Sequence, residues 1–226
     1  MSDLLFSSVQ PSVLRDQVYA AIRSAIVSGT LKPGTRLVEN EFAAKMGVSK
    51  APVREALRLL ESEGIVTTIP HRGSFVTKLT ESDVKEIHAL RSAIERLAVG
   101  LFMDNPNPAV LQELRSAIES MRRAESRGEL TDLSEADFRF HELIVYGCSS
   151  QRTARFWSDM QGLIKMLARE IDLTVNLTEG TTDRHLPILK AIEDGDKSRA
   201  QALMEQHVLN SAHHLETALK ARGSKR

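Results

Sequence analysis

One stretch of this chain, residues 41–75, constrains its fold more than any other. It begins with two short helical patterns, and Gly47 stands at the break between them, where a sharp turn favours a residue that tolerates positive φ. Ser49 then occupies the N-cap position of the second helix. The apolar residues of that helix recur at helical spacing: Val53, Ala56, Leu57 and Leu60. Two β-branched or aromatic runs follow, separated by a turn at residues 70–73. The stretch predicts a helix-turn-helix followed by a two-stranded wing.

A basic stripe follows another side of the second helix, where cations recur every four residues at Lys50, Arg54 and Arg58. Such a stripe suits a recognition helix, which must meet phosphates and present long hydrogen-bond donors to base edges in the major groove. Arg72 and Gly73 lie at the expected tip of the wing, where Arg72 would reach a minor groove or a phosphate. The stripe also fits an ordinary solvated face balanced by neighbouring acids, and its spacing alone does not decide between these two interpretations.

Three segments make the pattern more specific: GTLKPGTRL, GVSKAPVREALRLLESEGIV and HRGSFV. Together they resemble the winged-helix domain of the GntR family of bacterial transcription regulators over residues 12–78. The resemblance implies a set of DNA-binding residues, which are Ser49, Lys50, Arg54, Arg58, Arg72 and Gly73. One departure is that Lys50 stands where the family most often has arginine. A point charge there replaces a fork that bonds guanine through two hydrogen bonds.

The charge distribution supports a DNA-facing domain although the formal net charge is zero. Residues 1–78 hold 10 Lys and Arg against 7 Asp and Glu, whereas the rest of the chain holds 20 against 23. The front of the chain is therefore modestly basic and the back modestly acidic, as expected when one domain meets a nucleic acid.

The expected location is the cytoplasm. Cys148 is the only cysteine, which excludes an internal disulfide framework and suits a reducing compartment. No apolar run approaches the roughly 18 residues of a membrane span. The N-terminus lacks the basic start and long apolar core of a signal peptide.

The expected fold is mainly α, with a winged helix-turn-helix domain over residues 1–78 and an antiparallel helical bundle over residues 79–226. The periodicity predicts one helix over residues 13–27 before the winged stretch. Beyond the wing the predicted helices are residues 81–103, 108–126, 132–146, 151–176, 182–194 and 197–221. Thr80 and Asp83 predict a capping box at the start of the first bundle helix.

Four residues of the bundle are candidate metal ligands. Asp137 and His141 lie four positions apart on one expected helix, so both project from the same face. His185 lies near the start of another helix, and His207 lies midway along the last. Three imidazoles and a carboxylate from three helices can converge on a divalent transition metal, and nitrogen-rich ligation suits zinc or nickel better than calcium or magnesium. The alternative is that these histidines are hydrogen-bonded core residues.

The region from about residue 81 to residue 221 is similar to the ligand-sensing helical (FCD) domain of the FadR-type subfamily. Metal-binding members carry D-x-x-x-H, then a histidine followed by an apolar run and Gly-Asp, then a histidine on the last helix. The matching positions here are Asp137, His141, His185 and His207, with Gly195-Asp196 in the expected place. The resemblance implies a bound divalent metal, with zinc expected and nickel the alternative. Four protein ligands leave about two octahedral positions for water or a carboxylate.

Arg91 is the candidate effector-binding residue. It lies on an apolar stripe of the first bundle helix, where an unpaired charge is costly. With Glu95 it matches the R-x-x-x-E pattern of the family. Two interpretations stay open, namely a guanidinium clamp for an effector carboxylate and a structural ion pair with an acid on a facing helix.

The remaining histidines and the bulky side chains of the fourth bundle helix predict no further site. His71, His88, His213 and His214 are expected to be surface or incidental residues. Phe156, Trp157 and Met160 are expected to pack in the core, as is Cys148.

These features together predict a homodimeric, DNA-binding transcription regulator, a repressor, that reads a palindromic operator. Dimerisation is expected because one recognition helix reads too few base pairs, and the resemblance implies that the first and fourth bundle helices contribute to it. A small carboxylic acid at the metal would control operator affinity, and it can do so only through different affinities for two states of the protein. The alternatives are a metal-dependent hydrolase, which lacks an evident general base beside the metal, and a metal-ion sensor.

Overall fold

The structure is a computed structural model that describes residues 13–174 and 180–223, with side-chain surroundings described as far as residue 169 and from 180 to 213. The chain divides into two compact units between Lys78 and Leu79, and each unit is described by itself. The mainly helical fold predicted from the sequence is confirmed. Within the described residues, no helix has an apolar stretch long enough to span a lipid bilayer.

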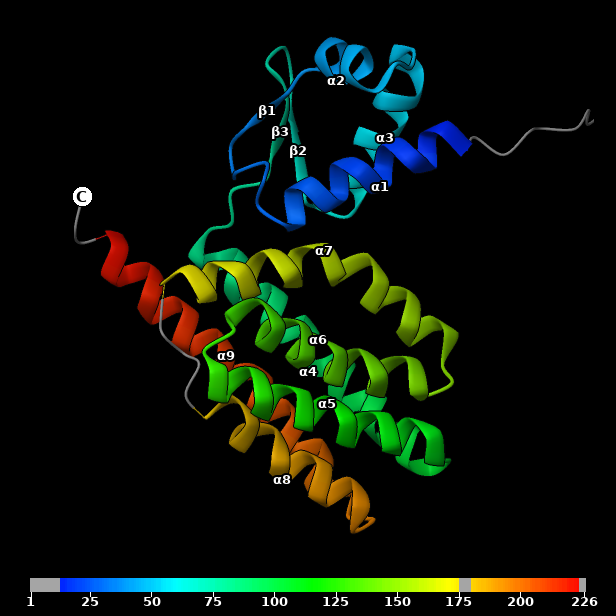
Figure 1. Cartoon of the computed structure of the whole chain (residues 1–226), viewed down its shortest axis with the longest axis vertical. Helices are drawn as coiled ribbons and strands as arrows, with labels where there is room; N and C mark the ends of the chain where they lie inside the picture. The colour runs from blue at the N-terminus through cyan, green and yellow to red at the C-terminus, as the bar shows by residue number, and fades with distance from the viewer. Residues whose placement is uncertain (1–12, 175–179, 224–226) are drawn as a thin grey trace, which may run out of the picture. The chain divides into compact units, whose positions relative to one another are not determined.

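The N-terminal unit is a winged helix-turn-helix (Figure 1). Its elements are α1 (Val13–Val27), β1 (Arg36–Leu37), α2 (Glu39–Met46), α3 (Lys50–Ser62), β2 (Val66–Ile69) and β3 (Gly73–Val76). The strands form an antiparallel sheet in the order β1-β3-β2. The predicted two-stranded wing is therefore incomplete, because β1 adds a third strand through the pair Leu37 and Ser74. A strand of two residues carries no alternating pattern from which it could be predicted.

The turn between α2 and α3 forms as the sequence predicts. Gly47 ends α2 with φ 65°, a left-handed conformation that glycine adopts without steric cost. Ser49 occupies the N-cap position of α3, although its side chain makes no capping hydrogen bond. The inward residues of α3 are buried as predicted: Val53, Ala56, Leu57 and Leu60. They pack with the buried face of α1, so the basic side of α3 is left at the surface.

Two hydrogen bonds connect α1 to the end of α3. Glu63 accepts a hydrogen bond from Arg23 Nε at 2.9 Å and another from the hydroxyl of Tyr19. Burial, together with the hydrogen bond and negative charge of Glu63, raises the pKa of Tyr19 to about 12. The phenol therefore stays protonated and acts as a donor that holds the two helices in register.

The C-terminal unit is a helical bundle (Figure 1). Its elements are α4 (Glu81–Asp104), α5 (Pro108–Arg127), α6 (Leu130–Gly147), α7 (Gln151–Thr174), α8 (Thr181–Glu193) and α9 (Lys197–Gly223). The most extensive contacts join α4 to α9 and α5 to α6. The largest fully buried side chains of its core are Phe102, Leu114, Met121, Phe140, Ile144, Trp157, Ile188 and Met204. Positions 175–176 of the predicted fourth bundle helix lie outside the described residues.

The predicted start of α4 is confirmed in detail. Thr80 and Asp83 form the expected capping box, in which Thr80 N donates to Asp83 Oδ2 at 2.7 Å and Asp83 N donates to Thr80 Oγ1 at 3.3 Å. The Asn107 side chain likewise accepts from Ala109 N at 2.9 Å at the start of α5. These caps satisfy backbone donors that have no partner within the helix.

Two packing expectations are wrong. Phe156 is 63% exposed, because Trp157 beside it takes the inward position and adjacent residues on a helix point about 100° apart. His88 is buried rather than at the surface, with Nδ1 2.8 Å from the carbonyl oxygen of Val84. Cys148, Trp157 and Met160 pack in or against the core as predicted.

Candidate functional site

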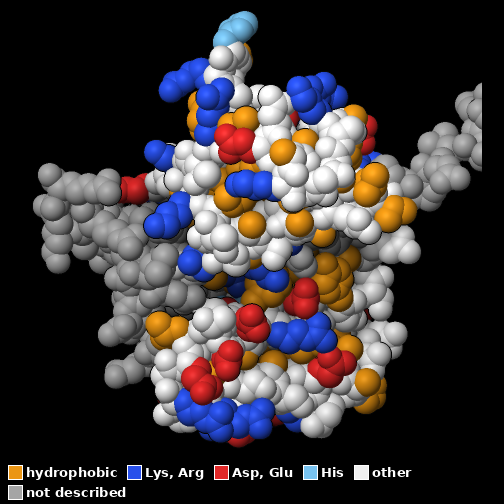
Figure 2. All heavy atoms as spheres, turned by 45° about the horizontal axis from the view of Figure 1, so that its top comes forward, with side chains coloured by type: hydrophobic (Ala, Val, Ile, Leu, Met, Phe, Trp, Pro, Cys, Tyr) orange, Lys and Arg blue, Asp and Glu red, His pale blue; other side chains and the backbone are white. Residues whose placement is uncertain are grey.

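The six candidate DNA-binding residues all lie at the surface of the N-terminal unit. They are Ser49, Lys50, Arg54, Arg58, Arg72 and Gly73. The first four belong to the start and the outer face of α3, whereas Arg72 lies in the turn between β2 and β3 and Gly73 begins β3. Lys and Arg side chains are spread over this unit on the face drawn in Figure 2. The structure therefore presents the basic stripe and the wing tip to solvent, as contact with a duplex requires.

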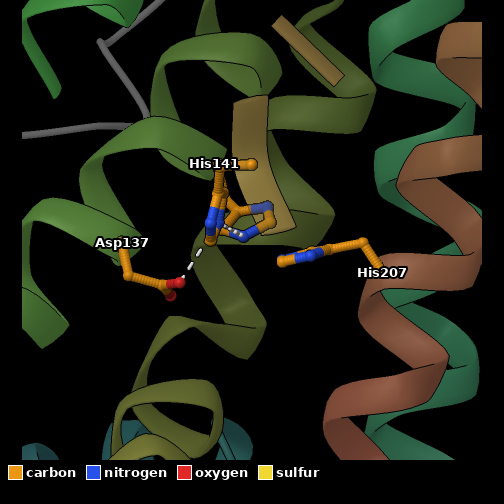
Figure 3. A group of neighbouring side chains, drawn as sticks. Asp137, His141 and His207 are labelled. Carbon is orange, nitrogen blue, oxygen red and sulfur yellow. Dashed lines mark hydrogen bonds and ion pairs between the residues drawn. The ribbon is translucent and has the colours of Figure 1, made fainter. Parts of the chain in front are cut away.

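The four candidate metal ligands come together inside the bundle. Asp137 and His141 project from α6, His185 from α8 and His207 from α9. One ligand atom from each lies within 4.8 Å of the others, and Figure 3 shows Asp137, His141 and His207 directed at one another. Neighbouring ligand atoms bound to one zinc ion at about 2.1 Å are about 3.4 Å apart in a tetrahedral site. The four side chains would therefore have to move inward by about an ångström to bind one ion together.

Each of the two buried imidazoles is oriented by a hydrogen bond on its far side. His141 Nδ1 donates to the carboxylate of Glu95, and His185 Nδ1 donates to the carbonyl oxygen of Thr181 at 2.8 Å. Both Nε2 atoms consequently face the centre of the cluster, which is how metal-binding histidines are usually held. The roles of Glu95 and Thr181 were not predicted from the sequence. The signal for Glu95 was its place one turn beyond Arg91 on a buried helix face.

Positive charge at the centre of the cluster would stabilise its geometry. The Nε2 atoms of His141 and His185 are 3.2 Å apart, and Asp137 Oδ1 is 3.2 Å from Nε2 of His185. Two neutral rings donating through Nδ1 would direct lone pairs at each other across that distance, which is unfavourable in a buried site. A proton shared with Asp137 or a metal ion removes the repulsion. A metal ion would in addition bind His207, whose ring centroid lies 4.3 Å from that of His185.

Burial and neighbouring charges set the protonation states of the cluster. Burial lowers the pKa of His141 more than Glu95 raises it, and burial with the nearby imidazoles holds the pKa of His207 well below its usual value. Burial alone would raise the pKa of Asp137, but the hydrogen bond and charge of His185 outweigh it and the pKa falls. Neutral His141 and His207 and an ionised Asp137 are the forms that bind a metal.

Arg91 is buried and paired, but not with the partner that was expected. Its Nε donates to Glu95 Oε1 at 2.5 Å, so the acid lies one turn along the same helix rather than on a facing helix. Glu95 is fully buried and bridges Arg91 to His141. The guanidinium carbon also lies 5.8 Å from the ring centroid of Trp157, whose Nε1 has no hydrogen-bond partner within the described residues. Arg91 is thus tied to the metal-ligand cluster through one carboxylate.

Comparisons with known proteins agree with both halves of the structure. Residues 14–76 match the family described as bacterial regulatory proteins, gntR family, and residues 86–210 match the FCD domain. The chain is 31% identical over 222 residues to the uncharacterized HTH-type transcriptional regulator YdhC of Bacillus subtilis, covering 97% of this chain and 98% of that one. It is 28% identical over 198 residues to the HTH-type transcriptional repressor RspR of Escherichia coli, covering 86% of each. The solved structure of E. coli McbR/YncC has the same fold, with a TM-score of 0.77 at 23% identity over 91% of this chain and 98% of that one.

Proposed function

Because this chain belongs to the gntR family of bacterial regulatory proteins and carries an FCD domain, it is a DNA-binding transcriptional regulator, and we propose that a metal-anchored ligand controls its operator affinity. The family and the relatives are transcriptional regulators and not enzymes, so the hydrolase alternative is set aside. Repression is the proposed direction of control, because relatives such as RspR carry the name repressor. We also propose that the protein is located in the cytoplasm, because that is where a bacterial operator lies.

In this proposal α3 lies in the major groove of a palindromic operator. Lys50 and Arg58 meet phosphates, Arg54 reads a base edge, and Arg72 reaches the adjacent backbone or minor groove from the wing. The N-terminus of α3 at Ser49 and the backbone of Gly73 allow close approach to phosphates. The exposure of all six residues supports these roles.

The bundle holds the ligand at a divalent metal, with zinc expected and nickel the alternative. Asp137, His141, His185 and His207 would bind the ion, and the ion would supply a positive charge that attracts a small carboxylic acid. The observation that carries this half is the convergence of these four side chains, with the two buried imidazoles already oriented by Glu95 and Thr181. Arg91 is the proposed partner of the effector carboxylate. Its Nε donates to Glu95, but the guanidinium has further N–H donors that can bind the effector.

The protein is proposed to act as a homodimer, which a palindromic operator requires. Exposed apolar side chains on two bundle helices support this assignment. Leu90 and Leu97, both on α4, are 51% and 52% exposed, and Phe156 on α7 is 63% exposed. Leu90 and Leu97 are seven residues apart and therefore share one side of α4. Pairing of these helices with the same helices of a second copy would remove this apolar surface from water.

Operator binding measured with and without acids tests the proposal. A duplex selected from a random library by the protein would be labelled, and its binding followed by anisotropy. Zinc-loaded protein would be titrated with a panel of small di- and tricarboxylic acids, and chelator-treated protein would serve as the control. We expect one acid class to change operator affinity at least about tenfold, which corresponds to a coupling free energy of about 1.4 kcal/mol. If operator affinity changes with zinc but with none of the acids, the protein is a metal sensor. If operator affinity changes with neither zinc nor an acid, ligand control is refuted.

A further inference from the structure

A carboxylate lies inside the basic surface that faces DNA. Glu39, in the first turn of α2, bonds Arg54 of α3, with Arg54 Nη2 2.8 Å from Glu39 Oε2 and Nε 3.1 Å from Oε1. The two side chains are 32% and 55% exposed. Hydrogen bonds from Arg54, and then its charge with those of Lys50 and Arg58, lower the pKa of Glu39 although burial opposes this. Glu39 is therefore an ionised acid that bonds Arg54 and lies within the electrostatic influence of Lys50 and Arg58.

Stability does not account for this acid. An exposed ion pair contributes little to folding, because water screens it and holding two long side chains costs conformational entropy. A negative charge close to the expected path of phosphates also weakens attraction to any duplex, whatever its sequence. The placement of Glu39 therefore has a cost in DNA affinity.

The stereochemistry of the pair suggests what the acid does. Glu39 occupies the side of the guanidinium formed by Nε and one hydrogen of Nη2. The opposite edge, formed by Nη1 and the second hydrogen of Nη2, makes no hydrogen bond or ion pair within the described residues and is left as a two-donor fork. That fork matches the N7 and O6 acceptors of guanine in the major groove. A guanidinium fixed on one edge loses less conformational freedom when it binds a base with the other.

We propose that Glu39 is a positioning residue for operator specificity. It orients the guanidinium of Arg54 so that the free edge can bind one base pair. Its negative charge also lowers the affinity for duplexes that do not offer that base. The inference rests on the DNA-reading role given to Arg54 in the proposed function. The orientation of Arg54 matters more in this chain because Lys50, the first cation of the stripe, is a point charge without a fork. Base discrimination by α3 then depends on how Arg54 is oriented.

The chain offers a matched control for the charge of Glu39. Glu41 is an exposed acid in the same first turn of α2, and it makes no ion pair with Arg54 in the described residues. Glu39→Gln and Glu41→Gln remove the same charge from the same helix terminus, but only the first releases Arg54. Arg54→Ala then identifies the base pair that Arg54 reads.

The experiment selects binding sites from a randomised duplex library with the full-length wild type and each of the three variants. The affinity of every protein for the wild-type site and for a scrambled duplex of equal length is then measured by anisotropy. We expect Glu39→Gln to lose sequence preference at the base pair lost in Arg54→Ala, and its ratio of specific to non-specific affinity to fall about tenfold. Glu41→Gln should keep both the preference and the ratio, while non-specific affinity rises similarly in the two variants.

Three results would overturn the inference. If the Glu39→Gln variant selects the wild-type site and keeps the wild-type ratio of specific to non-specific affinity, Arg54 needs no positioning. Equal loss of the ratio in Glu41→Gln would assign the effect to net charge or to the α2 terminus. A wild type that enriches no sequence would remove the DNA-reading role itself, and with it the proposed operator. Thermal unfolding with an unchanged midpoint in all variants separates these outcomes from misfolding.

Discussion

Nδ1 of His141 donates a hydrogen bond to Glu95, a fully buried carboxylate on another helix. This contact fixes the tautomer of the ring and directs its Nε2 atom into the cluster of candidate ligands. The negative charge of Glu95 also makes the imidazole a stronger base and hence a stronger ligand. Burial would raise the pKa of Glu95, but the charge of Arg91 and the hydrogen bonds from His141 and Arg91 outweigh it and lower the pKa.

Glu95→Gln should therefore weaken metal binding without removing a ligand. The loss expected for such an outer partner is about 10- to 100-fold in affinity. Competition for zinc between the protein and a chelating dye measures this directly. Glu86→Gln, an exposed acid on the same helix, is the control and should bind zinc as the wild type does. An unchanged zinc affinity in Glu95→Gln would mean that His141 does not depend on this contact.

Arg91→Lys separates the two interpretations of the buried arginine. Lysine keeps a positive charge beside Glu95 but has no fork for a carboxylate. If Arg91 clamps the effector, affinity for the active acid should fall about tenfold while zinc content stays the same. Arg91 would instead be a purely structural partner of Glu95 if the variant lost zinc and folded poorly. In that case the protein that stays folded would bind the acid with unchanged affinity.

Trp157 should report binding in the bundle through its fluorescence. It is the only tryptophan of the chain, it is fully buried, and its ring stacks on Phe138 with centroids 5.8 Å apart. Phe138 follows the candidate ligand Asp137, and the guanidinium of Arg91 lies beside the indole. Emission should therefore change when zinc or an acid binds, and the titration should saturate at the same stoichiometry as direct metal analysis. Constant emission while zinc binds would show that the indole of Trp157 is not coupled to the metal site.

Tyr19 gives the N-terminal unit a predictable dependence on pH. Because the pKa of Tyr19 is raised from about 10 in an unfolded chain to about 12 in the folded one, the protonated phenol favours the folded state. Its contribution is complete below pH about 10 and is lost as the pH rises toward about 12. Tyrosinate absorbance should show a group that ionises near 12, absent from Tyr19→Phe and retained in Tyr146→Phe. Ionisation of Tyr19 near pH 10 would show that the bond to Glu63 is not formed.

Much of the fold follows from local patterns in the sequence. The i, i+4 spacing of Asp137 and His141 fixes their common face whatever surrounds the helix, and the capping box at Thr80 involves residues three apart. Apolar periodicity likewise predicts the buried face of α3. The family resemblance then indicated which histidines on other helices belong with His141.

The contacts that the sequence did not predict join residues that are distant along the chain. Glu95 and His141 are separated by 46 positions, and Glu39 and Arg54 by 15. Neither pair produces a periodic signal, because their partnership depends on how two helices pack. The third strand, β1, was missed for a related reason, since its two residues form a strand only by pairing with β3.

The central claim is that one divalent metal ion is held by Asp137, His141, His185 and His207, and elemental analysis of the purified protein tests it most directly. The wild type should carry close to one zinc or nickel ion per chain, and His71→Ala, an exposed histidine outside the bundle, should match it. The double variant His141→Ala, His185→Ala should carry almost none. Asp137→Asn, which keeps the shape of a partly exposed side chain, should carry much less than the wild type while circular dichroism shows an intact bundle. Metal content that is equal in the wild type and in both cluster variants would contradict the account.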